Sequence, residues 1–266
     1  MSSKLFPLDN MRHAILTLIL AAFSVLLTAS AQNPGAVVSA GADIEVKQKL
    51  RDFEQGKLSL EALTEKSGEE FDRRLITFYC EHTNEVSVKA LLPISRCYAF
   101  FDDFNQAAQL AERYVQVYSN DWHGWRIVGA ANAALTNFDK ALCGYTNAVR
   151  LGDNRSCVQL GVCAWKLDRL DIMKEILPCV FAAKDNPRSE KYKTDALFVL
   201  LVYSTNADRE DVFVKALAGV EPSEIAARED LTGLFLTVYD RFKTKDLQPL
   251  CEKVRALSKN STEGKQ

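Results

Sequence analysis

The sequence predicts an all-α fold, an α-solenoid built from stacked helix-turn-helix units. Of its 266 residues, 47% are hydrophobic and 26% are charged, which supplies enough apolar material for a substantial core. Only 12 Gly and 7 Pro are present, few for a fold with many tight turns between strands. In the middle of the chain, pairs of segments with helical apolar periodicity recur every 32 to 34 residues. These three observations together favour repeated pairs of helices.

An export signal precedes the predicted fold. Residues 14–27 read AILTLILAAFSVLL, an apolar run shorter than the ~20 residues that a membrane-spanning helix needs. The run follows Lys4 and Arg12, and the small residues Ala29-Ser30-Ala31 come after it. This order is typical of a signal peptide with an A-x-A cleavage site. We therefore expect residues 1–31 to be removed after Ala31, which makes the mature chain periplasmic or secreted.

Two alternatives concern this segment. An uncleaved signal would anchor the chain in the membrane, and this is the only contact with a membrane that the sequence suggests. A start at Met11 would leave a more compact signal than the start at Met1. The sequence does not decide between bacterial and eukaryotic export.

The charge of the mature chain argues against a nucleic-acid partner. Removal of Lys4, Arg12 and Asp9 with the signal leaves 31 basic and 34 acidic residues, a net charge of −3. Nucleic-acid binders neutralise phosphates with clustered Lys and Arg, whereas here the charges alternate in sign along the chain. We interpret them as the solvated outer faces of helices.

Seven cysteines lie in the mature chain, at positions 80, 97, 143, 157, 163, 179 and 251. Export would allow one or two disulfides to persist. The number is odd and no C-x-x-C pair occurs. We therefore expect most of these side chains to be small buried hydrophobic groups.

Residues 122–153 form the most regular repeat unit. Apolar and small residues recur at helical spacing on both sides of a break at Thr136-Asn137, where Asn137 is a suitable N-cap. In the first segment they are Trp125, Val128, Gly129 and Ala133, and in the second Phe138, Ala141, Tyr145 and Ala148. Shifts of 34 residues towards the N-terminus and 32 towards the C-terminus give related units, with Tyr145 falling on Leu177. We predict that the small residue of each first helix lets the second helix approach closely.

The pattern of this unit resembles the tetratricopeptide repeat (TPR), W-x2-L-G-x2-Y, then A-x3-F-x2-A, then P, over 34 residues. Five residues match, and three departures are Val128 for Leu, Asn132 for Tyr and Asp153 for Pro. The matching residues are Trp125, Gly129, Ala141, Tyr145 and Ala148. The resemblance implies a right-handed α-solenoid of TPR-like repeats over residues 43–258, with the best repeats at 88–121, 122–153 and 154–185.

The flanking segments also have helical periodicity. Ser67 to Glu70 is a capping box for a helix that ends near Glu81, and Pro93 marks a helix start or kink. Further helices are expected at 44–54, 191–203, 208–217, 229–242 and 247–257. Residues 32–42 are expected to be a flexible linker and residues 259–266 a disordered tail.

Standard active-site motifs are absent from the sequence. The mature chain has two histidines, His82 and His123, so it has no His-rich metal site, and it contains no G-x-S-x-G, G-x-G-x-x-G or G-K-[ST] motif. We predict no catalytic residue, cofactor or metal. The alternative from another class is an exported thiol enzyme or hydrolase whose site assembles from scattered residues, with a cysteine activated by one of these histidines.

The resemblance implies a binding groove lined by the first helix of each repeat. TPR grooves commonly hold an extended peptide or a partner helix through repeat positions two, five, nine and twelve. In the two better-registered units these positions are Lys89, Leu92, Arg96, Ala99, His123, Arg126, Ala130 and Ala133. Lys89, Arg96, His123 and Arg126 would form a basic stripe able to hold an acidic peptide or a C-terminus. The plainer interpretation is a set of ordinary exposed cations on helices.

The sequence thus predicts a non-catalytic protein-interaction scaffold in the cell envelope or outside the cell. Trp122, at a predicted helix start, is the one tryptophan expected to contact a partner, because Trp125 and Trp165 fall at packing positions. The rival within the class of binding proteins is a structural repeat protein that associates with itself through an exposed terminal hairpin.

Overall fold

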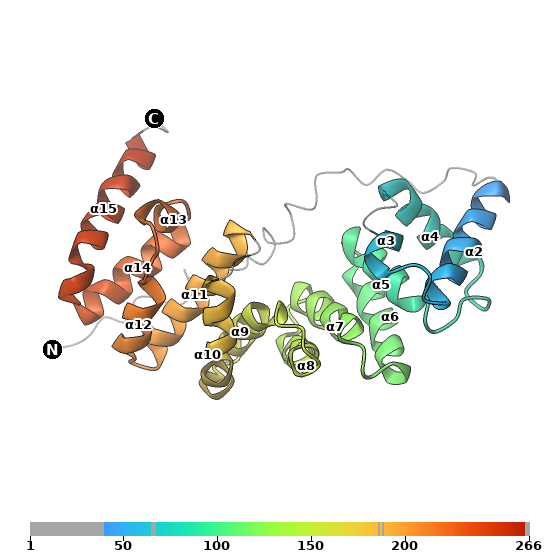
Figure 1. Cartoon of the computed structure of the whole chain (residues 1–266), viewed down its shortest axis with the longest axis horizontal. Helices are drawn as coiled ribbons and strands as arrows, with labels where there is room; N and C mark the ends of the chain where they lie inside the picture. Colours follow the sequence, from blue (N-terminus) through green and yellow to red (C-terminus); the bar gives the residue numbers. More distant parts are fainter. Residues whose placement is uncertain (1–39, 65–67, 186, 188, 264–266) are drawn as a thin grey trace. The chain divides into compact units, whose positions relative to one another are not determined.

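The computed structural model describes residues 40–64, 68–185, 187 and 189–263 (Figure 1). Within these ranges the chain is helical and has no strand, which confirms the predicted all-α fold class. None of the described helices is both long enough and apolar enough to cross a bilayer. The predicted signal peptide, residues 1–31, lies outside the described residues.

The described residues form two compact units, 40–153 and 154–263. The division lies between Asp153 and Asn154, where the sequence also places a boundary between two repeats. The helices of the first unit are α2 (Ala40–Glu54), α3 (Leu60–Thr64), α4 (Glu69–Glu81), α5 (Leu91–Phe100), α6 (Phe104–Val117), α7 (Trp122–Ala134) and α8 (Phe138–Arg150).

The second unit has seven α-helices and one 3₁₀ turn among its described residues. They are α9 (Ser156–Lys166), α10 (Leu170–Asp185), α11 (Glu190–Asn206), α12 (Glu210–Leu217), α13 (Pro222–Ala226), α14 (Glu229–Phe242), η1 (Lys245–Leu247) and α15 (Gln248–Glu263). In the first unit α5 packs on α6, α6 on α7 and α7 on α8, and in the second unit α9 packs on α10, α10 on α11 and α11 on α12. The predicted repeats 88–121, 122–153 and 154–185 contain the hairpins α5–α6, α7–α8 and α9–α10.

Side-chain caps mark the start of some of the helices. Asp103 and Ser189 each accept a backbone N–H at the start of a helix, from Gln106 at 3.1 Å and from Tyr192 at 3.2 Å. Asn137 does hold the N-cap position of α8, but its side chain makes no capping hydrogen bond. Pro93 lies in the first turn of α5, where the missing backbone donor costs little.

Both expected tails are shorter than the sequence predicts. Helix α2 begins at Ala40, so the last three residues of the expected linker 32–42 are helical, and residues 32–39 lie outside the described part. Helix α15 continues to Glu263, so the expected disorder from residue 259 is wrong up to that residue. Extending an existing helix costs far less than nucleating one, and between Pro249, in the first turn of α15, and Gly264 the sequence has no glycine or proline.

The predicted nesting of small and bulky residues is confirmed in the α7–α8 hairpin. Gly129 of α7 is buried, and a Cβ added there would lie 2.7 Å from the ring of Tyr145 in α8. Gly144 of α8, which is not part of the predicted repeat pattern, lies against the backbone of Gly129 itself. The two helices therefore approach closely because neither carries a side chain at the crossing point.

The nesting differs in the α9–α10 hairpin. Gly161 of α9 is buried, but the side chains closest to it are Val199 of α11 and Ile176 of α10. Leu177, the predicted counterpart of Tyr145, is only half-buried. The register of α10 is thus one residue away from the predicted register. Helix α11, buried on most of its surface from Ala196 to Ser204, supplies the packing partner that the second helix provides in the preceding repeat.

Candidate functional site: the face of α5 and α7

The four predicted partner-binding cations belong to the first unit. Arg96 lies on α5, and His123 and Arg126 lie in the first turns of α7. Helices α5 and α7 are the first helices of adjacent hairpins and contact each other. We refer to Arg96, Trp122, His123 and Arg126 as the α5–α7 face.

Lys89 has a different environment. It precedes α5, and its Nζ donates a hydrogen bond of 2.6 Å to the backbone carbonyl of Glu54, at the end of α2. The same ammonium lies 5.8 Å from the centre of the Phe53 ring. A cation at the C-terminus of a helix is stabilised by the helix dipole and by the terminal carbonyls. Lys89 therefore connects α5 to α2, and the cations gathered around α7 are the candidates for binding.

Three side chains of the α5–α7 face stack on one another at the start of α7. The rings of Trp122 and His123 are stacked with 3.5 Å between their centres. The guanidinium of Arg126 lies 4.8 Å from the centre of the Trp122 ring, one turn further along the helix. Trp122 is half-buried, so one part of it packs within the cluster while the other meets solvent. Such a cluster offers positive charge and a flat apolar surface together.

Asp121 fixes the orientation of His123. Its Oδ1 accepts the backbone N–H of His123 at 2.9 Å as the N-cap of α7, and Nδ1 of the imidazole lies 2.9 Å from the same oxygen. Its Oδ2 accepts the hydroxyl of Tyr114 at 2.6 Å. Burial tends to raise the pKa of Asp121, but the hydrogen bonds from His123 and Tyr114 outweigh it and the net shift is downward. With Nδ1 held in this way, Nε2 of His123 faces away from Asp121.

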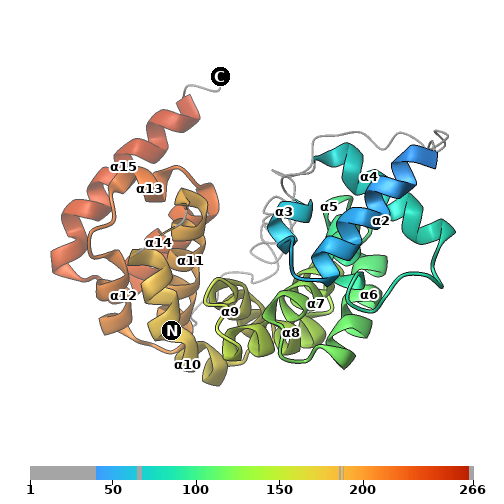
Figure 2. The ribbon, with the colours of Figure 1, turned by 45° about the vertical axis from the view of Figure 1, so that its right-hand side comes forward.

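Helix α3 lies beside α5 (Figure 2). Oε1 of Glu61 lies 3.6 Å from Nε2 of His123. A backbone N–H hydrogen bond lowers the pKa of Glu61, partial burial opposes this, and the charges of His123 and Arg96 lower it further. The α5–α7 face thus already holds one carboxylate, which comes from the chain itself.

The apolar side of α3 is buried. Leu63 is completely inaccessible to solvent, and Leu60 and Thr64 are also buried. Leu92 of α5, which the TPR resemblance places in an open groove, is only 2% exposed. The expected groove position at Leu92 is therefore covered in this structure.

Helix α3, Glu61 and Asp121 belong to this site but were not predicted from the sequence. Signals for them exist in the sequence. Ser59 accepts the backbone N–H of Ala62 at 3.1 Å and so caps α3, and Leu60, Leu63 and Thr64 have helical spacing. Asp121 directly precedes the predicted helix, where an aspartate N-cap is common. A helix of five residues is too short to stand out from the repeat pattern around it.

The free cysteines of the described residues are either buried or exposed. Cys97 and Cys163 are buried, and burial raises the pKa of both thiols, that of Cys163 to about 12. Cys80 and Cys143 are exposed, and the sulfur of Cys80 lies 3.4 Å from the hydroxyl of Tyr98. Within the described ranges, no cysteine sulfur is hydrogen-bonded to His82 or His123. The alternative of a thiol enzyme therefore has no cysteine–histidine pair to rest on among these residues.

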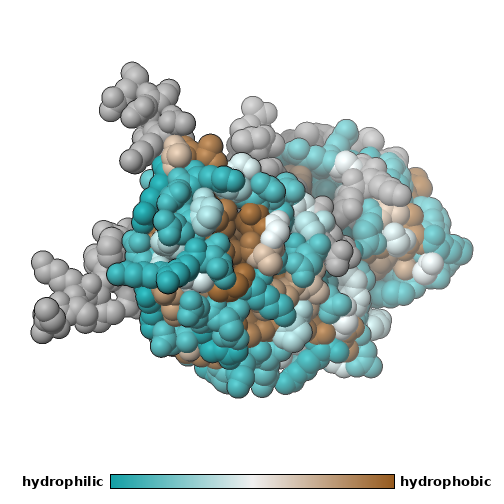
Figure 3. Space-filling view, turned by 60° about the vertical axis from the view of Figure 1, so that its left-hand side comes forward, coloured by the Kyte–Doolittle hydropathy of each residue, from teal (hydrophilic) through white to brown (hydrophobic). Residues whose placement is uncertain are grey.

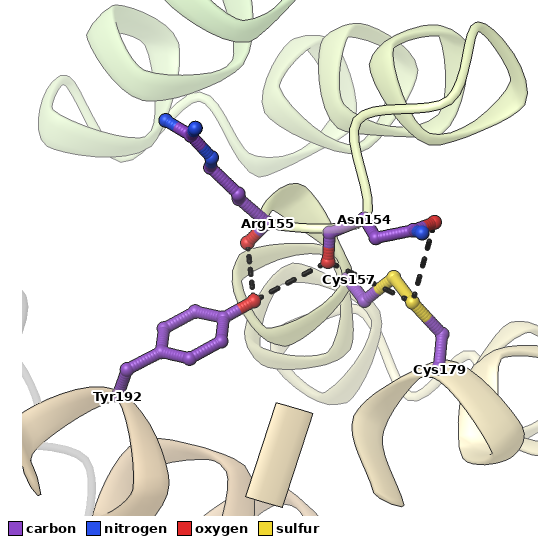
Figure 4. Close-up of a disulfide and its surroundings, with 5 residues drawn as sticks. All are labelled: Asn154, Arg155, Cys157, Cys179 and Tyr192. Carbon is purple, nitrogen blue, oxygen red and sulfur yellow. Dashed lines mark hydrogen bonds between the residues drawn. A yellow bond between two sulfur atoms is a disulfide. The ribbon is translucent and has the colours of Figure 1, made fainter. Parts of the chain in front are cut away.

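One pair of cysteines forms a disulfide in the second unit, between Cys157 of α9 and Cys179 of α10 (Figure 4). Tyr192 of α11 reaches the same region and donates its hydroxyl to the backbone carbonyls of Arg155 at 2.8 Å and Asn154 at 3.3 Å. The start of α9 is thus tied covalently to α10 and by hydrogen bonds to α11. The sequence allowed one or two disulfides without deciding which cysteines pair.

In the second unit, two basic side chains form close ion pairs within the unit. Its half-buried Arg228 is held by Asp195 at 2.6 Å and by Asp230 at 2.9 Å. Lys193 pairs with Glu224 of α13 at 2.6 Å.

On one side of the molecule a hydrophobic surface area is surrounded by hydrophilic residues (Figure 3). Val214 and Leu257 are the large exposed hydrophobic side chains of this unit among the described residues. No group of three or more metal-ligating side chains occurs in the described part of the chain.

Comparisons with known proteins support the fold. No protein-family model matches the sequence, and no curated protein matches it. Among solved structures, that of YrrB, described as a TPR protein with an unusual peptide-binding site, is similar with a TM-score of 0.50 at 13% identity, over 71% of this chain and 97% of YrrB. A crystal structure of MamA is similar with a TM-score of 0.46 at 16% identity, over 58% of this chain and 91% of MamA. Together with the repeated hairpins, the likeness to YrrB shows that this chain has a TPR-like helical fold.

Proposed function

We propose that this chain is an exported, non-catalytic protein-interaction scaffold that binds an acidic peptide or partner segment on the α5–α7 face. One observation carries the proposal. The face combines cations with an exposed part of an aromatic ring, and a carboxylate, that of Glu61, already lies against it at 3.6 Å from His123. A carboxylate from another protein would meet the same chemistry.

The face is organised before any partner arrives. Asp121 holds the imidazole of His123, and the Trp122 ring supports the guanidinium of Arg126. Side chains that are already ordered lose less conformational entropy on binding, so more of the interaction energy appears as affinity. Hydrogen bonds between charged groups would strengthen the contact with a carboxylate. Because Trp122 is half-buried, an apolar side chain next to that carboxylate would find a surface to pack against.

The fold supports this role. Stacked helical hairpins present the first helices of successive repeats side by side, which creates an extended surface for a partner. YrrB, which has a similar fold, is described as having a peptide-binding site. We extend peptide binding to this chain as part of the proposal.

Two features support export. The N-terminal residues have the pattern of a signal peptide, and the Cys157–Cys179 disulfide would persist in an oxidising compartment such as the periplasm or the extracellular space. A fusion of residues 1–31 to a reporter that is active only after export tests this part of the proposal. Reporter activity equal to that of a fusion lacking these residues would contradict it.

The binding proposal is tested by panning the mature chain, residues 32–266, against displayed random peptides. We expect enrichment of peptides that carry an acidic residue next to apolar ones. The affinity of an enriched peptide should fall about tenfold or more in the variant Arg126→Glu, since a charge that attracts the carboxylate becomes one that repels it.

The matched control is Arg113→Glu, which makes the same charge change at an exposed position on α6, the second helix of its hairpin. This variant should bind as the wild type does. Equal losses in both variants, or no loss in Arg126→Glu when circular dichroism shows it folded, would overturn the proposal.

A further inference from the structure

Helix α3 does not belong to the repeat pattern. It is inserted between α2 and α4, which pack on each other, and it contacts α2 and α5. Five residues are too few for a helix to be stable alone in water, so α3 depends on the surface it covers. That surface includes α5, the first helix of its hairpin.

The contacts that α3 makes are of the kinds that a bound peptide would make, apolar on one side and charged on the other. Leu60 and Leu63 supply a buried apolar side, and Glu61, between them, supplies a carboxylate directed at His123 and close to Arg96. The side chain of Glu61 is 44% exposed, so this end of the contact is open to solvent and to competition. The pattern is leucine, acid, any residue, leucine.

We infer that α3 is an internal ligand of the α5–α7 face, and that the external partner is a short helical protein segment with the same pattern of two leucines and an intervening acid. This inference rests on the proposed function, because it identifies the ligand class and the regulation of the same face. The partner binds when α3 leaves, so its apparent affinity is reduced by the fraction of molecules in which α3 is seated.

The experiment uses the chain's own segment as the probe. A fluorescently labelled peptide with the sequence of residues 57–64, KLSLEALT, is titrated with the mature chain and its variants, and binding is followed by fluorescence anisotropy. Two variants loosen α3 in different ways. Ala62→Gly lowers its helix propensity, and Glu61→Lys replaces the attracted carboxylate by a repelled ammonium.

We expect each variant to bind the peptide about fivefold or more tightly than the wild type, because the face is open in a larger fraction of molecules. Glu70→Lys, the same charge change at an exposed position in α4, is the matched control and should bind as the wild type does. A second peptide with lysine in place of its glutamate should bind the Ala62→Gly variant about tenfold less tightly.

Equal affinity of the wild type, Ala62→Gly and Glu61→Lys for the peptide would overturn the inference. If peptides selected by panning still depended on Arg126 in that case, the proposed function would stand without the internal ligand. Neither variant removes a buried leucine, and circular dichroism and thermal unfolding verify that each is folded.

Discussion

The hairpins α7–α8 and α9–α10 occupy corresponding places in two adjacent repeats, yet they are held together differently. In α7–α8, Gly129 and Gly144 let the two backbones meet, and the ring of Tyr145 covers Gly129. In α9–α10, the second helix has no glycine and contains Pro178, and a disulfide joins it to the first helix.

This difference shows that the two helices of a repeat can be held together either by close backbone packing or by a disulfide. Close approach of backbones contributes many small dispersion contacts and leaves no room for an added atom. A disulfide tolerates looser packing, because it stabilises mainly by restricting the unfolded chain. The hairpin that matches the TPR pattern best therefore needs no covalent link, while the more degenerate one carries it. Substitutions that add atoms to the core should therefore destabilise the α7–α8 hairpin more, and reduction of the disulfide should destabilise the α9–α10 hairpin more.

The largest expected effect is that of Gly144→Ala. The new Cβ would lie 2.5 Å from the backbone nitrogen of Gly129 and 3.0 Å from the carbonyl oxygen of Trp125, and neither can move without shifting a helix. We expect the free energy of unfolding to fall by about 4 kcal/mol, measured by chemical denaturation.

Gly233→Ala in α14 is the matched control, because an added Cβ there meets no atom within 4 Å. It should leave stability unchanged or raise it by up to about 1 kcal/mol through helix propensity. Similar losses at Gly144 and Gly233 would show that the close approach of α7 and α8 is not what limits this position.

Removal of the disulfide should have the next largest effect. The double substitution Cys157→Ser and Cys179→Ser opens a link between residues 22 positions apart and should lower the free energy of unfolding by about 3 kcal/mol. Cys143→Ser, at an exposed free cysteine, is the control and should change stability little. A reductant should destabilise the wild type but not the double variant, and equal sensitivity of both would contradict this interpretation.

A smaller loss of stability is expected for substitutions at Gly129 of α7 and Gly161 of α9, the glycines in the first helices of the two hairpins. Gly129→Ala forces a Cβ against the Tyr145 ring at 2.7 Å, whereas Gly161→Ala meets a methyl group of Val199 at 2.6 Å. At Gly129 three atoms of the Tyr145 ring lie within 2.9 Å of the added Cβ, whereas at Gly161 only one methyl group of Val199 is that close and the next atoms are at 3.4 Å. We expect losses of about 2 kcal/mol for Gly129→Ala and about 1 kcal/mol for Gly161→Ala in thermal unfolding. The reverse order would show that the α9 glycine is the more tightly packed one.

The smallest expected effect is a gain. Pro178 lies inside α10 on its exposed side and cannot donate the helical hydrogen bond at its position. Pro178→Ala should raise the free energy of unfolding by about 1 kcal/mol, and chemical denaturation would detect it. A loss of stability would mean that the bend imposed by the proline is needed to seat α10.

Much of the fold could be predicted from the sequence, because its signals are local. Gly129 and Tyr145 identify the packed side of α7–α8, and Gly56, Pro93 and Gly152 lie close to observed helix ends. The candidate site was harder to predict from the sequence than the fold. The place of Lys89 at the end of α2, the pairing of Cys157 with Cys179 and the contact of Glu61 with His123 each join residues far apart in the sequence. Repeat spacing specifies which side of a helix a residue occupies, but it does not specify what covers that side.

The central functional claim is that α3 occupies the face that binds a partner. Amide hydrogen exchange at Leu63, whose N–H donates to the carbonyl of Ser59 at 3.0 Å, tests it most directly when compared with and without a saturating peptide selected by panning. We expect peptide binding to speed exchange in α3 and to leave the exchange of the α8 amides unchanged. Unchanged or slower exchange in α3, with the peptide demonstrably bound at Arg126, would contradict it.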